Sequence, residues 1–261
     1  MKTVLRSRTN ERVQRWRRLV RDARARRAER RIVLEGEHLA EALLASGGRP
    51  RAAVVREGRE QDPRMAALLD RLGCPVFLAA PGVLAALAEA RSPAALLVEA
   101  DMPEAAGPQR SAPAARSLLL DGVQDPGNVG AILRSAAAFG VETVYFGRGC
   151  ADAWSAKSLR AAAGAHFALR LALVPNPVAV LERFHGAVIA AIAHGGISLG
   201  DAQWCEPVLW LFGAEGKGLD AELVRRATLC VSVPTNGRVE SLNVAAAATL
   251  CLYEAWRRCA Q

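Results

Sequence analysis

The 261-residue sequence contains no apolar run of the roughly 18–20 residues that a membrane-spanning helix needs, because charges interrupt every candidate. The N-terminus is basic, but no apolar segment follows it, so we also expect no signal peptide. Both absences favour a cytoplasmic protein without a membrane partner. Hydrophobic residues make up 51% of the chain, enough for the core of one large domain or two ordinary ones.

The six cysteines include no Cys-x-x-Cys pair, and four of them lie in apolar or helical stretches. This spacing favours neither a zinc site nor a disulfide framework. We therefore expect reduced, mostly buried thiols and no bound metal. The cysteines are Cys74, Cys150, Cys205, Cys230, Cys251 and Cys259.

Lysine is also scarce, because only three of the 34 basic residues are lysines. The formal net charge is +8 and is unevenly distributed: residues 1–31 hold thirteen basic and three acidic residues, and the rest is slightly acidic. Arginine forms bidentate contacts with phosphate, so this cluster indicates a polyanionic partner such as RNA. The alternative is a solvated helix that only aids solubility.

The basic segment is predicted to be one helix over residues 10–31, with Asn10 as its N-cap. Arginines occupy the other faces, and we interpret Trp16 as an anchor that docks the helix and not as a base-stacking residue. The apolar residues at helical spacing are Val13, Trp16, Leu19 and Val20.

A small α/β domain is predicted over residues 32–100, followed by a Pro- and Ala-rich linker at 101–116. The domain contains no recognisable catalytic constellation, and we interpret His38 as structural or RNA-contacting. The expected helices are Glu37–Ala45, Pro63–Leu72 and Pro81–Ala90, and the expected strands are Arg51–Val55, Pro75–Ala79 and Ala94–Glu99.

A second α/β domain is predicted over residues 117–261, where alternating strands and helices imply a mostly parallel sheet covered on both faces. The expected strands are Leu118–Asp121, Thr143–Phe146, Leu171–Val174, Ala187–Ile192, Val208–Phe212 and Leu229–Val233. The expected helices are Val129–Phe139, Ser155–Ala163, Pro177–Phe184, Ala221–Arg226 and Ser241–Arg258.

This pattern alone would also suit a dinucleotide-dependent oxidoreductase, but the Gly-x-Gly-x-x-Gly motif is absent. The glycine-rich segment Phe212–Asp220 is not a P-loop either. Its three glycines within six residues follow an apolar strand and let the backbone turn tightly against a ligand. Glu215 is therefore a candidate functional carboxylate; the alternative is an acidic residue in a flexible loop.

A second candidate segment is Asp121–Gly140, in which a strand end, a Pro-Gly turn and a helix beginning near Asn128 follow one another. Ligands of α/β proteins bind beyond strand carboxyl ends and near helix N-termini. Asn128 and Arg134 are six residues apart and do not share a helical face by simple spacing. Either Arg134 approaches the site from the helix flank, or the turn brings Asn128 over. The alternative is an Asn cap with a surface arginine.

The third segment is Val233–Glu254, in which Ser241 is a candidate N-cap for an alanine-rich helix. A cap at Ser241 places Asn243 in the first turn and leaves that residue unexplained. Ala245–Ala248 are small enough for close helix packing, at a homodimer interface or in another tight crossing.

Together, the three segments resemble the SpoU (TrmH-like) branch of the SPOUT RNA methyltransferases. The matching motifs are Asp-Pro-Gly-Asn-Val-Gly-Ala-Ile-Leu-Arg-Ser-Ala, Phe-Gly-Ala-Glu-Gly-Lys-Gly-Leu and Val-Glu-Ser-Leu-Asn-Val-Ala, in the family's order, within residues 117–258. The resemblance implies a deep trefoil knot, which is an exception to the usual rules of chain threading. The run Leu34-Glu35-Gly36-Glu37-His38 is similar to the start of the family's attached substrate-binding domain, which resembles a ribosomal-protein RNA-binding fold.

The resemblance also implies S-adenosylmethionine as the cofactor, RNA as the partner, and a homodimer in which the final helix contributes to the site. Many members have asparagine where this chain has Ala214, which we interpret as family variation. The implied cofactor-binding residues are Gly213, Gly218, Val233 and Leu242. The implied catalytic residues are Asn128, Arg134, Glu215, Ser241 and Asn243.

The implied reaction is methylation of a ribose 2′-hydroxyl, and it needs no metal because a sulfonium methyl group is already electrophilic. A guanidinium is ordinarily always protonated. We therefore favour an Arg134 that stabilises the developing alkoxide and orients a proton-accepting phosphate over a deprotonated Arg134. We expect 23S rRNA as the substrate, with guanosine as a candidate nucleotide; the alternatives are tRNA 2′-O-methylation and a non-catalytic RNA-binding or ribosome-assembly factor.

Overall fold

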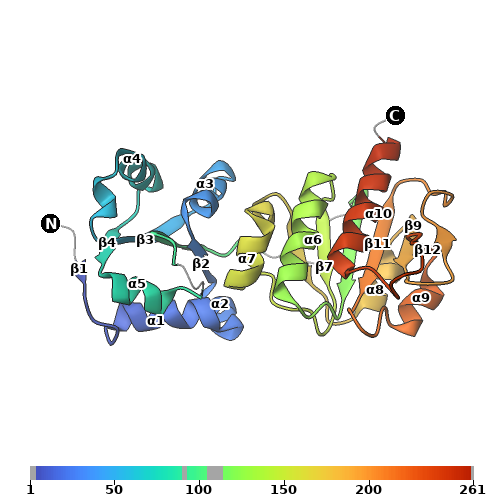
Figure 1. Ribbon diagram of the computed structural model, residues 1–261, viewed down its shortest axis with the longest axis horizontal. Helices are drawn as coiled ribbons and strands as arrows, with labels where there is room; N and C mark the ends of the chain where they lie inside the picture. The colour runs from blue at the N-terminus through green and yellow to red at the C-terminus, as the bar shows by residue number, and fades with distance from the viewer. Residues whose placement is uncertain (1–3, 90–92, 105–113, 260–261) are drawn as a thin grey trace. The chain divides into compact units, whose positions relative to one another are not determined.

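The computed structural model describes residues 4–89, 93–104 and 114–259. These residues divide into two compact units that are each discontinuous in sequence (Figure 1). Unit 1 comprises Met1–Glu104 and Asp152–Phe167, and unit 2 comprises Ala105–Ala151 and Ala168–Gln261. Residues 105–113 of the predicted linker lie outside the described residues. Within the described ranges, no helix is long and apolar enough to cross a membrane.

Unit 1 is built on a five-stranded mixed sheet with the strand order β1-β4-β3-β5-β2. β1, β4 and β3 pair in parallel, whereas β5 is antiparallel to both β3 and β2. The strands are β1 (Val4–Leu5), β2 (Arg31–Glu35), β3 (Pro50–Arg56), β4 (Val76–Ala79) and β5 (Leu96–Asp101).

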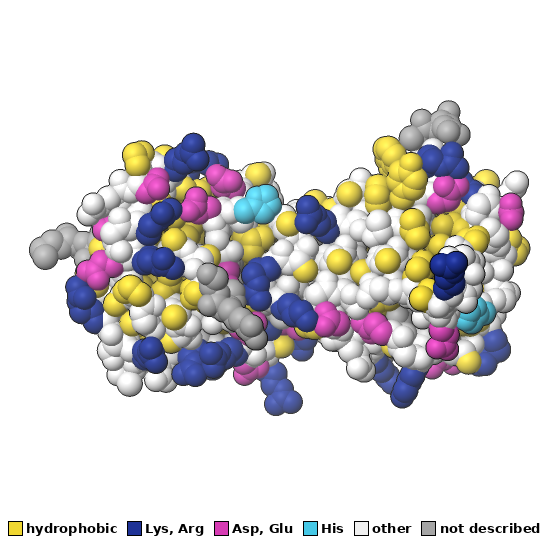
Figure 2. Space-filling view, in the orientation of Figure 1, with side chains coloured by type: hydrophobic (Ala, Val, Ile, Leu, Met, Phe, Trp, Pro, Cys, Tyr) yellow, Lys and Arg dark blue, Asp and Glu magenta, His cyan; other side chains and the backbone are white. Residues whose placement is uncertain are grey.

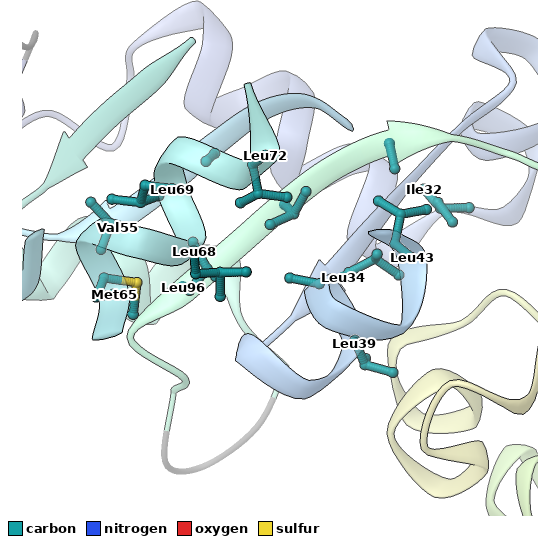
Figure 3. Close-up of a cluster of buried hydrophobic side chains, with 14 of the residues drawn as sticks. Ile32, Leu34, Leu39, Leu43, Val55, Met65, Leu68, Leu69, Leu72 and Leu96 are labelled. Atoms are coloured by element: carbon teal, nitrogen blue, oxygen red, sulfur yellow. The ribbon is translucent and has the colours of Figure 1, made fainter. Parts of the chain in front are cut away.

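Helices cover both faces of this sheet. Apolar side chains of α1 (Glu11–Arg21), α2 (Ala23–Glu29) and α5 (Pro81–Leu87) pack on one face. Those of α3 (Glu37–Ala45) and α4 (Pro63–Leu72) pack on the other, where Leu43 and Leu68 point toward the strands (Figure 3). α7 (Ala156–Ala162) belongs to unit 1 as well, because Ala156 and Leu159 are buried in these two cores.

The single helix predicted over residues 10–31 is wrong, because the chain forms α1 and α2 there. Asp22 is extended, and its carboxylate accepts the amide of Arg24 at 2.7 Å, so a new helix begins. The predicted Asn10 cap is confirmed by its 3.0 Å bond from the amide of Arg12. Trp16 is only 3% exposed and donates its indole N–H to Glu99 at 2.7 Å, so it anchors α1 to the sheet.

Unit 2 contains a seven-stranded sheet with the order β10-β12-β9-β11-β6-β7-β8. Every pairing in it is parallel, which confirms the predicted mostly parallel α/β sheet. The strands are β6 (Arg116–Asp121), β7 (Thr143–Phe146), β8 (Arg170–Leu173), β9 (Ala187–Ala191), β10 (Ile197–Ser198), β11 (Val208–Gly213) and β12 (Leu229–Ser232).

α8 (Pro177–Arg183) and α9 (Ala221–Arg226) pack through Leu181 and Leu223 on one face of this sheet. α6 (Pro126–Ala138) and α10 (Val244–Cys259) lie side by side (Figure 1). They are joined by a 2.7 Å hydrogen bond between the hydroxyls of Ser135 and Thr249. Ala248 of α10 is fully buried, so the small residues of this helix serve a tight crossing within the chain.

Three short strands were missed, β1, β2 and β10, together with the 3-10 turns η1 (Arg59–Gln61) and η2 (Ala165–Phe167). β2 follows α2 with no glycine between them, because Arg30 itself adopts the left-handed conformation that ends the helix. The predicted helix Pro81–Ala90 ends at Leu87, where Ala88 turns extended, and Ala90 lies outside the described residues.

Five cysteines have described side chains, and all five are unpaired. The expectation that they are mostly buried is wrong, because Cys205 is exposed and three others are only partly buried. Cys251 alone among the five is buried, and burial raises the pKa of its thiol to about 12. No group of three His, Cys, Asp or Glu side chains that could hold a metal occurs in the described part of the chain.

Candidate active site

The predicted site residues follow the carboxyl ends of neighbouring strands in unit 2. The chain runs outward from β6 through β7 to β8 and then crosses to β9, so the strand order reverses beside β6. Ligands of parallel α/β sheets bind at such a reversal. The register pairs Gly213 of β11 with Asp121 of β6, so the loops after these two strands start side by side.

The loop after β6 leads into α6 through a capped turn. The Asp125 carboxylate accepts the amides of Gly127 at 2.5 Å and Asn128 at 3.1 Å, and Pro126 fills the first helical position. The helix therefore begins at Pro126, earlier than the predicted start near Asn128. Because Asp125 is the cap, the Asn128 side chain is free to reach the neighbouring loops.

Asn128, Glu215 and Asn243 form a chain of directed hydrogen bonds that joins all three predicted segments. Asn128 donates its side-chain amide to the Glu215 carboxylate at 2.9 Å, and its amide oxygen accepts from Asn243 at 3.1 Å. A carboxylate can only accept, so it fixes the orientation of Asn128, and Asn128 in turn fixes that of Asn243. The direction of each bond follows from the ionised state of Glu215.

Glu215 also accepts the backbone amides of Gln124 at 3.3 Å and Asp125 at 3.4 Å. Burial raises the pKa of this carboxyl, but the hydrogen bonds from Asn128 and the backbone outweigh it and hold the pKa below its ordinary value. Glu215 is therefore ionised at neutral pH and ties the glycine-rich loop to the start of α6.

Asn243, and not Ser241, caps the final helix. The Asn243 side-chain oxygen accepts the amides of Ala245 at 2.9 Å and Ala246 at 3.3 Å, and α10 begins at Val244. The predicted start of this helix at Ser241 is thus wrong by three residues. The cap explains why an asparagine stands at position 243, because one amide both begins the helix and bonds to Asn128.

A cavity of about 360 Å³ opens beside this chain of hydrogen bonds. Its walls come from the ends of β9, β11 and β12 and from the first turns of α10. The predicted site residues that line it are Gly213, Glu215, Gly218, Val233, Ser241, Leu242 and Asn243. The lining also includes residues that the sequence analysis did not single out: Ile192 and His194 in the loop after β9, and Thr235 and Glu240 within the third segment.

Gly213 allows the backbone of Gly218 and Leu219 in the glycine-rich loop to approach it closely. A Cβ at this position would lie 2.2 Å from the Gly218 carbonyl carbon and the Leu219 nitrogen, which are backbone atoms. The loop closes because Ala214 and Gly218 exchange two backbone hydrogen bonds of 3.0 and 2.9 Å. Gly218 itself has a φ of +69°, which favours glycine.

The lining fits S-adenosylmethionine. A volume of about 360 Å³ lies in the range of roughly 300–1,000 Å³ typical of small-molecule sites. Phe212, Val233 and Leu242 provide apolar wall, and in the described structure the backbone amides of Val233 and Leu242 donate to no protein acceptor. The adenine ring of the cofactor offers both an apolar face and nitrogen acceptors for such amides.

Ser241 and Arg134 do not take part in the hydrogen bonds among Asn128, Glu215 and Asn243. Ser241 lines the cavity, but its hydroxyl is exposed and has no hydrogen-bond partner among the described residues. Arg134 lies on α6, is exposed, does not line the cavity, and likewise has no acidic partner within the described ranges. Its guanidinium is therefore available to a molecule other than its own chain.

The family model described as the SpoU rRNA Methylase family matches residues 115–253. The chain is 34% identical to an uncharacterised tRNA/rRNA methyltransferase of Synechocystis, over 90% of this chain and 87% of that protein. It is 32% identical to the 23S rRNA (guanosine(2553)-2′-O)-methyltransferase RlmP of Bacillus subtilis, over 94% and 95% of the two chains.

Solved structures of RNA methyltransferases are similar to this chain as well. The SpoU methyltransferase AviRb of Streptomyces viridochromogenes, in complex with AdoMet, superposes with a TM-score of 0.87 at 28% identity, over 97% and 99% of the two chains. An RNA 2′-O ribose methyltransferase superposes with a TM-score of 0.86 at 31% identity, over 99% and 100%.

Fold and site together define an RNA methyltransferase of the SPOUT class that uses S-adenosylmethionine. The chain belongs to the SpoU rRNA methylase family. The predicted family, cofactor and enzyme class are thus confirmed, whereas the trefoil knot stays a prediction. An oxidoreductase and a non-catalytic factor are both disfavoured by this membership.

Proposed function

We propose that this enzyme methylates a ribose 2′-hydroxyl in 23S rRNA, with guanosine as the candidate nucleotide. The hydrogen-bonded set of Asn128, Glu215 and Asn243 beside the cavity carries the proposal. RlmP, which matches nearly the whole chain, is named for a 23S guanosine. A 23S rRNA (uridine(2479)-2′-O)-methyltransferase of Streptomyces viridochromogenes, which matches 54% of the chain, is named for a 23S uridine. A tRNA substrate is not favoured, and an rRNA substrate implies a cytoplasmic enzyme.

When bound, S-adenosylmethionine supplies an electrophilic methyl group. The chain has to hold the ribose and help its hydroxyl lose a proton as the carbon–oxygen bond forms. We assign Asn128, Asn243 and Ser241 to holding the ribose, and Glu215 to orienting the two asparagines. Arg134 stabilises the alkoxide and orients an RNA phosphate that takes the proton.

Mapping of 2′-O-methylation across total RNA tests the substrate. All RNA has to be surveyed, because the ribose hydroxyl distinguishes RNA from DNA but not one RNA from another. Cells that lack the gene are expected to lose methylation at one 23S rRNA nucleotide. Re-expression of the wild-type chain should restore the methyl group. Loss confined to a tRNA nucleotide would reject the proposed substrate while leaving the enzyme class intact.

We further propose that the enzyme is a homodimer whose interface includes α10. Leu250, Tyr253 and Trp256 are 43%, 44% and 41% exposed on this helix, although they are large and apolar. Tyr253 and Trp256 pack around Phe139 at ring-centroid distances of 5.7 and 6.1 Å. Hydrophobic side chains are visible along α10 in Figure 2. An exposed apolar cluster of this kind is typical of a protein interface.

Replacing Tyr253 and Trp256 with glutamate is expected to convert the dimer to a monomer, because each protomer would bury two unpaired negative charges at the interface. Sedimentation velocity measures the change. A matched variant, Leu173→Glu with Ile197→Glu, alters two other exposed apolar residues of unit 2 and should stay dimeric. A wild-type chain that sediments as a monomer at micromolar concentration would refute the homodimer.

We also propose that unit 1 binds RNA through an arginine surface, which we define as Arg17, Arg21, Arg24 and Arg27 of α1 and α2. All four side chains are exposed, and none has an acidic partner in the described structure. Figure 2 shows basic side chains gathered over the region that Figure 1 draws as α1 and α2. Unpaired guanidiniums are free to contact phosphates.

A further inference from the structure

The cavity of unit 2 is acidic, although the protein as a whole carries a net charge of +8. Glu215 and Glu240 are both among its lining residues, and no described lysine or arginine is. Lys217 and Arg238 belong to the same loops, but neither contributes to the lining. The fixed charges of the cavity therefore favour a cation over a neutral ligand.

The two carboxylates differ in what surrounds them. Glu215 accepts three hydrogen bonds and holds the glycine-rich loop against α6. Glu240 lies in the segment between β12 and α10, is exposed, and has no hydrogen bond or ion pair within the described residues. Its charge is not neutralised by a cation of its own chain and is available to a ligand.

Methyl transfer changes the charge of the cofactor by one unit. S-adenosylmethionine carries a positive sulfonium, whereas the demethylated product, S-adenosylhomocysteine, has a neutral thioether at the same place. The adenosine and amino-acid parts are the same in both molecules. A negative charge in the cavity consequently stabilises the bound methyl donor but not the bound product.

We propose that Glu240 is a specificity-determining residue that biases the cavity toward the sulfonium form of the cofactor over its demethylated product. The inference rests on the proposed function, because it concerns the cavity assigned to the cofactor. It gives Glu240 a task distinct from that of Glu215, whose carboxylate positions Asn128. Product exchange follows from it, since the attraction disappears once the methyl group has left.

Calorimetric binding to the full-length protein tests this role with three ligands. They are S-adenosylmethionine, S-adenosylhomocysteine and sinefungin, a non-reactive analogue in which a carbon bearing a protonated amine replaces the methyl-bearing sulfonium. Glu240→Gln removes the charge and keeps the shape. It should weaken the two cationic ligands on the order of fivefold and leave S-adenosylhomocysteine unchanged, as expected for one partly solvated charge pair.

Two further variants separate charge from structure. Glu240→Asp keeps the carboxylate and should retain the preference for cationic ligands. Asp201→Asn removes another exposed carboxylate of unit 2, outside the cavity lining, and should leave all three affinities unchanged. Since Glu240 has no described partner, Glu240→Gln should unfold at the wild-type temperature.

An equal loss of affinity for all three ligands would overturn the inference, because the side chain would then contact a part common to them. An unchanged ratio of the S-adenosylmethionine and S-adenosylhomocysteine affinities would overturn it as well. Both results leave the proposed function standing. A wild-type protein that binds none of the three ligands would instead reject the proposed function.

Discussion

Replacing Arg134 with alanine is expected to lower the rate of methyl transfer by about 10²–10⁴-fold, with little change in S-adenosylmethionine affinity. The side chain does not line the cavity, so cofactor contacts survive its removal. It also has no acidic partner in the described part of the chain, so folding stability should change little. The loss would therefore be confined to the chemical step.

Single-turnover kinetics on the substrate RNA, with calorimetric binding of the cofactor, measures this separation. Arg225→Ala is a matched control, because Arg225 is another exposed arginine of unit 2, on α9, and has no acidic partner among the described residues. That variant should keep wild-type rates. Arg134→Lys should recover little activity, since an ammonium lacks the planar fork that holds a phosphate oxygen and the alkoxide together. Near-normal turnover in Arg134→Ala would remove the residue from the mechanism.

The motifs could be predicted from sequence, but their contacts could not. Asn128 and Glu215 are 87 residues apart, and they meet because β11 pairs with β6 in a register that aligns Gly213 with Asp121. Strand order in a parallel sheet depends on packing across the whole unit, and a local pattern does not contain it. The three segments could therefore be ordered along the chain and not in space.

Local rules failed where two residues could perform the same task. Ser241 and Asn243 are both good N-cap residues, and serine preceded the apolar run, so the prediction chose Ser241. Asn243 caps α10 because its amide can also donate to Asn128, which a serine hydroxyl at the earlier position does not do here. Ile192 and His194 were missed for a different reason: the loop after β9 carries no motif, and only its place at a strand end indicates the cavity. Glu240 stands in the third motif, but the motif alone did not show that this residue lines the cavity.

The basic segment shows a third limit, because charge counts do not reveal ion pairs. Arg15 binds Glu99, Arg26 binds Asp152, and Arg31 binds Asp101. These partners lie far along the chain, 126 residues away for Arg26, so the sequence could not identify them. Removing residues 1–31 would also remove four core residues of α1 and expose the face they cover. Truncation would consequently test folding more than RNA binding.

Substituting the four residues of the arginine surface with glutamine avoids that problem and should weaken RNA binding on the order of 100-fold at low salt. Each lost phosphate contact reduces the slope of log affinity against log salt by about 0.7–0.9, so the slope should fall by about three. Fluorescence anisotropy with a labelled rRNA fragment, between 50 and 300 mM salt, measures both quantities. Stability should be retained, because all four side chains are exposed and unpaired in the described structure.

A charge-matched control removes four other arginines of unit 1 by glutamine substitution: Arg49, Arg59, Arg64 and Arg71. Of these, Arg59 alone has described ion pairs, at 3.5 and 4.0 Å on the surface, so little stability is lost with it. If the net charge of the chain governs binding, both variants will lose affinity equally, and the arginine surface has no special role. A larger loss and a flatter salt slope only in the α1–α2 variant would assign the RNA contacts to that surface, because the two proteins carry the same net charge.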